Sequence, residues 1–169
     1  MAGDMSRICA CCGQPVDNIP RYFMCHVPDS YISKKAELTF DDKFTCRGGD
    51  GDYFISCEVE LPFKEGGEDP LGFIGWVQVS SATYNAYRDY RTSTRNLPPY
   101  EDLVPGRMAN PIPEAPDTLG VAVKFRVLPG DPTPYIRWAE PNTPLAALME
   151  RGATIEFWHR LASRFLASH

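Results

Sequence analysis

The sequence predicts an α+β fold, in which two or three helices pack on one face of a mostly antiparallel sheet. Three observations predict it: segments that alternate apolar and polar residues, turn-forming residues between such segments, and amphipathic segments with helix-capping residues. The chain has 169 residues, of which 43% are hydrophobic, and this is enough for one compact core. We therefore expect a single domain over residues 1–169.

Strands are indicated first in the middle of the chain. Residues 52–61, DYFISCEVEL, alternate with period two, so one face of this strand is expected to lie toward the core. The turn RGGDGD before it predicts a hairpin with residues 43–46, KFTC. Residues 72–80, GFIGWVQVS, are apolar on both faces, as is typical of a more central strand. Two later strands are predicted at residues 120–128 and 135–140.

Helices are predicted at three places. Residues 80–91, SSATYNAYRDYR, begin with serines that suit an N-cap. Residues 144–151 follow Thr143 as a cap and precede Gly152, which is the expected asymmetry of helix ends. Residues 154–166, TIEFWHRLASRFL, place their large apolar side chains on one face.

The stretch 97–118, LPPYEDLVPGRMANPIPEAPDT, holds six prolines and no sustained period. Loops of this length are uncommon in compact domains and often serve as binding segments or lids. Proline also protects sheet edges from pairing. We expect a proline-rich flap here, either as a binding segment or as a cover for the edge of the sheet.

Charge and hydropathy limit the classes of partner. The net charge is −5 and basic residues are scattered, so the basic stripe of a nucleic-acid-binding protein is absent from the sequence. No apolar run reaches the roughly eighteen residues of a spanning helix, and the N-terminus does not resemble a secretion signal. We expect a cytoplasmic protein with reduced thiols, no membrane partner and no nucleic acid. An acidic surface fits a basic protein partner, or solubility alone.

A cysteine knuckle is predicted at residues 7–20, RICACCGQPVDNIP. Cys9 and Cys12 are two residues apart and Gly13 follows, which is the form of half a tetrahedral zinc site, whereas Cys11 would point elsewhere. A redox pair is less favoured, because no helical pattern follows to lower a thiol pKa. The third interpretation is that these thiols bind nothing. The candidates to complete a zinc site are Cys25, His26, Cys46 and Cys57.

Of these candidates, Cys57 is expected to be a core thiol, because it lies between Ile55 and Val59 on the inward face of its strand. Cys46 ends the strand before the hairpin, a position that we expect to be within reach of the knuckle. The sequence contains none of the short motifs of hydrolases, phosphate-binding loops, zinc proteases or dinucleotide-binding folds, and we predict no catalytic residue.

Tyrosines mark a candidate partner surface. Tyr84, Tyr87 and Tyr90 lie along one side of the first predicted helix, and Tyr100 lies in the proline-rich stretch. Such a stripe most often seats a helix on a sheet. Tyrosine is also enriched at binding surfaces, so the exposed members of this set are our candidate partner-binding residues.

Several segments of the chain together resemble a known bacterial family. They are CACCG near the start, YFISCEVELPF, GFIGWVQVS, PDTLGVAVKFRVLPG, and EPNTPLAALMERGATIEFWHRLASRF. The chain resembles domain-of-unknown-function family 2199, small bacterial proteins of uncharacterised activity, over roughly residues 7–166. The PDTLG segment at Pro116–Gly120 is among the most specific parts of the resemblance.

The resemblance implies a zinc ligand set. Family members typically carry a CxxCGxxH pattern and a further cysteine before the central hairpin strand, and the matching positions here are Cys9, Cys12 and Cys46. Val16 stands at the histidine position, so the chain departs from the pattern at the fourth ligand. Asp17, Cys25 or His26 are the candidates to replace it, or the site is empty. Any zinc would be structural.

Our first functional hypothesis is a non-enzymatic protein-binding module of the bacterial cytoplasm, for example an immunity-type protein that neutralises a toxin. The second is a metal-dependent enzyme or regulator with an ion held by cysteines. The third, a nucleic-acid-binding zinc-ribbon protein, is disfavoured by the charge.

Overall fold

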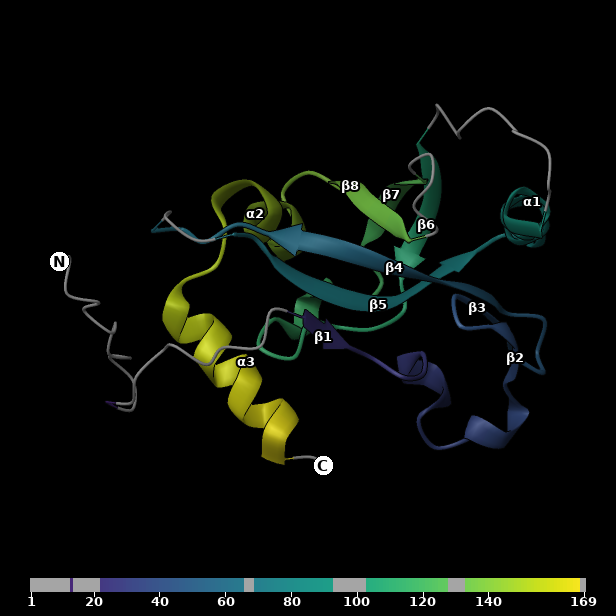
Figure 1. Ribbon diagram of the computed structural model, residues 1–169, viewed down its shortest axis with the longest axis horizontal. Helices are drawn as coiled ribbons and strands as arrows, with labels where there is room; N and C mark the ends of the chain where they lie inside the picture. Colours follow the sequence, from purple (N-terminus) through teal and green to yellow (C-terminus); the bar gives the residue numbers. More distant parts are fainter. Residues whose placement is uncertain (1–12, 14–21, 66–68, 93–102, 128–132, 168–169) are drawn as a thin grey trace, which may run out of the picture.

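The computed structural model describes residues 13, 22–65, 69–92, 103–127 and 133–167 (Figure 1). These residues form one eight-stranded sheet, three α-helices and three short 3₁₀ helices. The strands are β1 (Tyr22–Met24), β2 (Thr39–Asp42), β3 (Thr45–Arg47), β4 (Tyr53–Leu61), β5 (Leu71–Val79), β6 (Val104–Met108), β7 (Ala122–Val127) and β8 (Pro134–Ala139). The helices are α1 (Ser81–Thr92), α2 (Pro144–Arg151), α3 (Ile155–Ala167), η1 (Asp29–Tyr31), η2 (Lys35–Glu37) and η3 (Pro116–Thr118).

The long antiparallel hairpin of β4 and β5 is the centre of the sheet. Its register runs without interruption from Tyr53 opposite Val79 to Leu61 opposite Leu71. Aromatic and β-branched residues dominate both strands, which suits a pleated surface packed on both sides. β3 pairs antiparallel with the start of β4, as the glycine-rich turn predicts.

The sheet closes on itself, which the sequence did not predict. Strands β5, β6, β7, β8 and β4 are neighbours in that order, and the pairing of β4 with β5 completes a ring of five strands. The pairs are antiparallel except for β4 with β8 and for β1 with β5, which are parallel. The expectation of a mostly antiparallel sheet is therefore confirmed, but the sheet is a closed barrel with β1, β2 and β3 attached, rather than an open layer.

The helices do not share one face, which corrects the expected arrangement. Figure 1 shows α1 near one end of the β4–β5 hairpin and α2 and α3 near the other. A closed barrel has no single open face, so the helices cover different parts of its outside and its ends. Trp158 of α3 is fully buried and stacks on Phe23 of β1, with ring centroids 5.1 Å apart.

The helix caps agree with the sequence. The Ser80 hydroxyl accepts a hydrogen bond from the Thr83 amide, and the Thr143 hydroxyl accepts one from the Ala146 amide. Gly152 ends α2 with φ of +79°, a conformation that other residues rarely adopt. A β-carbon at this glycine would also lie 2.3 Å from the Pro62 carbonyl oxygen, so the close approach of two segments requires glycine as well.

β5 changes its partner along its length. Its first half pairs with β1, and Val77 and Gln78 pair with β6. Asn110 fills the gap between these two pairings: its Oδ1 accepts from the Trp76 amide at 2.8 Å and its Nδ2 donates to the Val27 carbonyl at 2.9 Å. The buried amide side chain thus takes the place of missing ladder hydrogen bonds.

Both faces of β4 are buried. Ile55 and Cys57 lie in the large core inside the barrel, and Cys57 is the core thiol that the alternation predicts. On the opposite face Phe54 belongs to a second, smaller core with Tyr31, Cys46, Trp76 and Ala109. Residues from η1 to β3 cover the part of this face around Phe54, and Glu58, further along the same face, is only 7% exposed.

The described part of the expected flap, residues 103–118, is not a flap over the sheet. Val104–Met108 form β6, which pairs with β7 on one side and β5 on the other. Pro105 is tolerated because the β5 pairing reaches only Arg107 and Met108, so no ladder bond is lost at the proline. Tyr100 and the rest of residues 97–102 lie outside the described residues.

Most of the expected cysteine knuckle at residues 7–20 also lies outside the described residues, which include only Gly13 of it. No helix in the described ranges is long and apolar enough to cross a membrane.

Candidate functional site

Of the three predicted zinc ligands, the structure describes only Cys46, since Cys9 and Cys12 lie outside the described residues. Cys46 is completely buried on β3, opposite Phe54 and in the smaller core. Burial, with a smaller contribution from the charge of Asp41, raises the pKa of its thiol to about 12. Zinc binds the thiolate, so an ion at Cys46 would have to offset this raised pKa.

Burial affects the other two described cysteines in the same way. Burial raises the pKa of Cys25 to about 12, with a contribution from the charge of Asp29, and raises the pKa of Cys57 well above its usual value. Within the described ranges, no group of three or more histidine, cysteine, aspartate or glutamate side chains is placed to hold an ion.

The structure separates the predicted tyrosines. Tyr84 and Tyr87 are 1% and 2% exposed and belong to the large core, so they seat α1 on the barrel and offer no surface to a partner in this conformation. Tyr90 is partly buried against the same core. The tilted contact of Tyr84 with Tyr53 of β4, at 5.1 Å between ring centroids, fixes α1 on the sheet.

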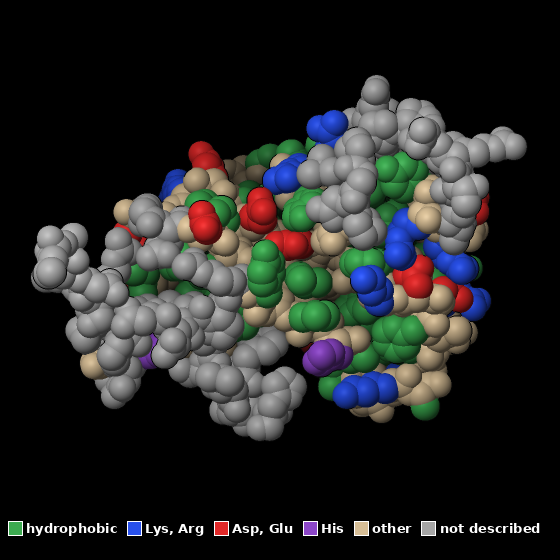
Figure 2. Space-filling model, viewed as in Figure 1, with side chains coloured by type: hydrophobic (Ala, Val, Ile, Leu, Met, Phe, Trp, Pro, Cys, Tyr) green, Lys and Arg blue, Asp and Glu red, His purple; other side chains and the backbone are tan. Residues whose placement is uncertain are grey.

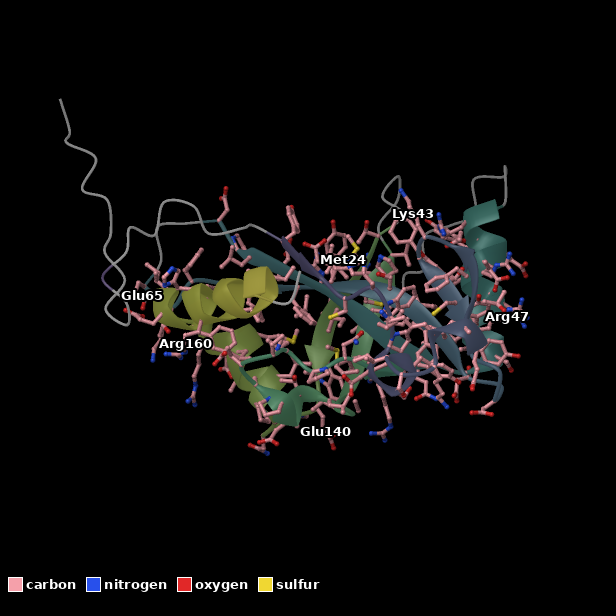
Figure 3. All side chains as sticks on the ribbon, turned by 90° about the horizontal axis from the view of Figure 1, so that it is seen from below. Met24, Lys43, Arg47, Glu65, Glu140 and Arg160 are labelled. Atoms are coloured by element: carbon pink, nitrogen blue, oxygen red, sulfur yellow. The ribbon has the colours of Figure 1, made fainter. Side chains whose placement is uncertain are left out.

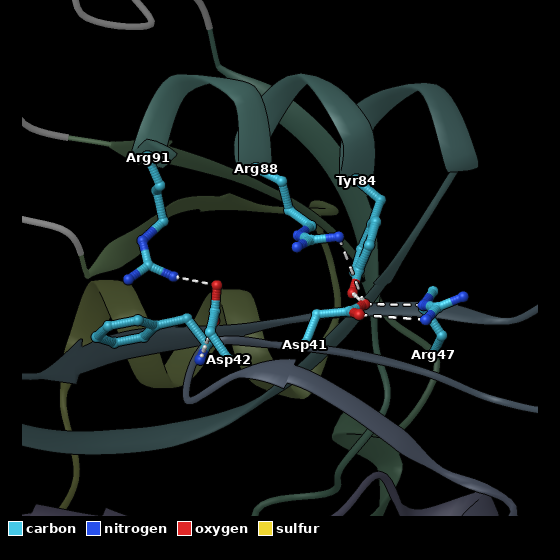
Figure 4. Close-up of polar contacts among 7 residues, drawn as sticks. Asp41, Asp42, Arg47, Tyr84, Arg88 and Arg91 are labelled. Carbon is cyan, nitrogen blue, oxygen red and sulfur yellow. Dashed lines mark hydrogen bonds and ion pairs between the residues drawn. The ribbon is translucent and has the colours of Figure 1, made fainter. Parts of the chain in front are cut away.

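A network of ion pairs fastens α1 to the β2–β3 hairpin (Figure 4). Asp41 receives two hydrogen bonds from the Arg47 guanidinium, at 2.8 and 3.1 Å, and a further one from the Tyr84 hydroxyl. The Arg88 guanidinium lies 3.8 Å from the same carboxylate. Arg91 pairs with Asp42 at 2.7 Å. We call these six residues the clamp.

The geometry of the clamp suits the attachment of α1 to the β2–β3 hairpin rather than proton transfer. The hydrogen bonds from Arg47 hold the pKa of Asp41 below its usual value, and the Tyr84 hydroxyl adds to this effect, although burial opposes it. Burial and the hydrogen bond to Asp41 raise the pKa of Tyr84 to about 12. A general acid or base needs a pKa near the working pH, and neither group has one.

The strongest surface feature is apolar and lies on the outer face of β1 and β5. Four of the six large hydrophobic side chains that are exposed among the described residues fall within residues 22–40: Tyr22 at 64%, Met24 at 52%, Ile32 at 56% and Phe40 at 50%. A concentration of exposed apolar side chains is typical of an interaction surface.

The register explains why several of these side chains are neighbours. Tyr22 lies opposite Gly72 and Met24 opposite Ile74, so their side chains share the outer face of the sheet with Trp76, two positions further along β5. Phe40 of β2 packs edge-on against Trp76, with ring centroids 5.9 Å apart. We call Tyr22, Met24, Ile74, Trp76 and Phe40 the apolar strip.

Two figures show the hydrophobic side chains on one face of the molecule and the position of Met24. Figure 2 shows hydrophobic side chains gathered over β4 and β5 in the middle of this face, with basic side chains toward the end that carries β2 and β3. Figure 3 shows Met24 between α3 and the hairpin that carries Lys43 and Arg47.

Sequence reasoning missed the strip. β1 has only three residues, too few to reveal a period, and Phe40 precedes two aspartates in a strand of four. The signal in the sequence that could have indicated β1 is the run of three large apolar residues, Tyr22, Phe23 and Met24. In the structure only the middle one is buried.

The fold and this surface define an α+β protein built on a closed five-stranded barrel, with an apolar strip on its outer face. The chain belongs to DUF2199, a family described as an uncharacterised protein conserved in bacteria, and the family model matches residues 8–153. The resemblance seen in the sequence is therefore confirmed. No curated protein and no solved structure matches the chain.

Proposed function

We propose that this protein is a non-enzymatic binding module of the bacterial cytoplasm, and that a protein partner contacts the apolar strip. The observation that carries the proposal is the concentration of exposed apolar side chains on residues 22–40. Exposed Tyr22 and Phe40 are the kind of large aromatic side chains that anchor protein interfaces, and Trp76 lies directly beneath Phe40.

The rigidity of this surface supports the proposal. Phe23 stacks on buried Trp158, and the Trp76 indole donates a hydrogen bond to the Cys25 carbonyl at 3.1 Å. Both contacts hold β1 in place before any partner arrives. A surface that is already ordered loses little conformational entropy on binding.

Charge favours a basic partner. The chain carries a net charge of −5, which speeds encounter with a positively charged protein and slows encounter with an acidic one. An immunity-type protein that masks a toxin is one concrete form of such a module. The immunity role rests on the acidic balance of the sequence, and the binding role rests on the apolar strip.

The test is photo-crosslinking in the bacterial host with the full chain. A photoreactive p-benzoylphenylalanine replaces Phe40 in one version and Leu119 in the other. Leu119 is the matched control, because it is 46% exposed but lies in the loop after η3, outside the strip. We expect one dominant protein adduct from position 40 and none of that mass from position 119.

Substitution of Tyr22 by serine in the position-40 version gives the second readout. Tyr22 shares the outer face with the strip but does not carry the crosslinker, so a partner seated on the strip would give a weaker adduct. Equal adducts from positions 40 and 119, or no adduct from position 40, would contradict the proposal.

A further inference from the structure

We infer that the partner docks by adding an extended strand to the edge of β1 that faces away from β5. The inference rests on the proposed function and specifies its mode of binding. The occupant is a segment of a net-positive partner protein that carries apolar side chains at alternate positions. Main-chain hydrogen bonds to a sheet edge then supply affinity, and the alternate side chains supply specificity.

The hydrogen bonding of β1 shows which of its main-chain groups are free. The Cys25 amide donates to the Ile74 carbonyl at 2.9 Å, so Cys25 and, by the alternation of a parallel ladder, Phe23 direct their main-chain groups toward β5. The N–H and C=O groups of Tyr22 and Met24 therefore point away from β5. In the part of the chain that the structure describes, no backbone group pairs with them.

The two end strands of the sheet differ in how their edges are protected. β1 and β2 are the two ends of the strand order. β2 carries Asp41 and Asp42 and has a register shift between Phe40 and Asp42, and both features discourage pairing with another strand. β1 reads Tyr-Phe-Met, with no charge and no proline, and its register is regular. Of these two edges, only that of β1 is a suitable template for a further strand.

The side chains of β1 suit this role as well. Phe23 faces α3 and fixes the strand, whereas Tyr22 and Met24 stand on the outer face with more than half of their surface exposed. In a strand added beside β1, every second side chain lies on this same face and contacts Tyr22 and Met24. These contacts extend the apolar strip into the partner.

A partner of opposite charge is favoured over a second copy of this chain. Two copies would bring net charges of −5 together, which opposes their association, while a basic partner gains from the same field. The added strand therefore comes from a different, basic protein.

The sharpest test is Met24→Pro in the chain that carries the crosslinker at position 40. Proline removes the Met24 N–H, which points away from β5, so the β1–β5 ladder keeps its hydrogen bonds. Met24→Ala is the matched control, because it loses most of the side chain, as proline does, but keeps the N–H. We expect the adduct yield to fall about tenfold with proline and by no more than about threefold with alanine.

The outcomes separate this inference from the proposed function. If the adduct yield from position 40 stays the same when Met24→Pro is added, strand addition is refuted, while the apolar strip remains the binding surface. No adduct from position 40 in any version would refute the proposed function and the inference with it. An adduct whose mass matches a second copy of this chain would refute the basic partner.

A second measurement covers the case in which Met24→Pro disturbs the fold, which circular dichroism of the variant would reveal. Amide hydrogen exchange is followed in the wild-type chain alone and in the complex copurified from the host. Strand addition predicts slower exchange at the Met24 amide in the complex. Unchanged exchange at Met24, with protection elsewhere on the strip, would refute it.

Discussion

At the scale of single residues, a few buried polar groups hold the irregular parts of the barrel. Thr118 is completely buried in the PDTLG segment. Its hydroxyl donates to the Ala115 carbonyl at 2.6 Å and accepts from the Ile112 amide at 2.8 Å. This hydroxyl closes the turn between β6 and β7, which explains why the segment needs a hydroxyl-bearing side chain there.

Replacing Thr118 by valine keeps the shape of the side chain but leaves the buried Ile112 amide and Ala115 carbonyl without this partner. We expect the free energy of unfolding to fall by about 1–3 kcal/mol in urea denaturation. Thr118→Ser retains the hydroxyl and should recover most of the loss. Equal destabilisation by valine and serine would show that packing of the methyl group matters, not the hydrogen bonds.

Gly106 lies where β6 approaches β5 closely. A β-carbon there would lie 2.4 Å from Val77 Cγ1 and 2.9 Å from the Gln78 carbonyl oxygen. Gly106→Ala should therefore lower the free energy of unfolding by about 1–3 kcal/mol, because the strands must move apart. Gly49→Ala is the control, since its nearest atom would be 3.8 Å away. A similar thermal midpoint for both variants would contradict this packing.

The three described cysteines should be unreactive in the folded protein. Burial raises the pKa of Cys25 and Cys46 to about 12 and that of Cys57 well above its usual value, so almost none of these thiols is ionised at pH 8. Mass spectrometry of peptides after iodoacetamide treatment should find these cysteines unlabelled until denaturant is added. Rapid native labelling of Cys46 would instead support the accessible position that the sequence suggested.

At the scale of elements, the clamp joins α1 to the β2–β3 hairpin, which would be only marginally stable by itself. β2 has four residues and β3 three, and isolated hairpins of this size are marginal in water. Asp41 and Asp42 fix this hairpin to Tyr84, Arg88 and Arg91 of α1. The ring of Phe44 also lies beneath the Arg91 guanidinium, 4.5 Å from it, and adds a cation–π contact.

The clamp predicts a pH dependence of stability. The Asp41 pKa is lower in the folded protein than its ordinary value of 3.8, so the unfolded chain takes up the proton first as the pH falls. Its stabilising effect is complete above about pH 4 and is lost as the pH falls through the folded pKa. Asp41→Asn should lower the free energy of unfolding by about 1–3 kcal/mol at pH 7, and this free energy should then fall less steeply with decreasing pH than in the wild type.

Urea denaturation between pH 7 and pH 2 measures this effect. Asp89→Asn is the control, because Asp89 is an exposed carboxylate on α1, the helix that Asp41 contacts. If the free energy of unfolding falls with pH as steeply in Asp41→Asn as in the wild type, Asp41 is not a cause of the pH dependence.

The elements differ in how far sequence predicts them. β4, β5, β7 and β8 are long enough to show their period, and the helices carry caps, so all were predicted within a few residues. β1, β2 and β6 were missed: β1 and β6 pair with β5, which is distant in the chain, and β2 has only four residues, two of them aspartates. β6 even contains a proline and a glycine, which locally favour a loop.

At the scale of the whole molecule, closure of the barrel could not be predicted from the sequence. It rests on the parallel pairing of β4 with β8, at Glu58 opposite Tyr135, between segments far apart in the chain. Glu58 is only 7% exposed although it lies on the outer face of the barrel, where a β-carbon at Gly72 would contact both its Oε1 and the Tyr22 ring. A local pattern identifies the two faces of a strand but not what covers each of them.

Local sequence patterns could not predict the candidate site either. The sequence directed attention to cysteines and to the tyrosines of α1, yet Cys46, Tyr84 and Tyr87 are core residues. Cys9 and Cys12 lie outside the described residues, so the zinc knuckle stays a prediction. The apolar strip exists only because β1 and β2 bring their side chains next to Trp76.

The central claim is that a protein partner occupies the apolar strip. Native mass spectrometry tests it most directly, on untagged chain from its bacterial host in chelator-free buffer. Wild type and Leu119→Ser should each carry one additional protein, and the Tyr22→Ser/Phe40→Ser double variant should be bare. Any added mass of one zinc, lost in Cys9→Ser, would separately establish the knuckle. A bare wild-type chain, or a double variant that keeps the partner as fully as wild type, would contradict the account.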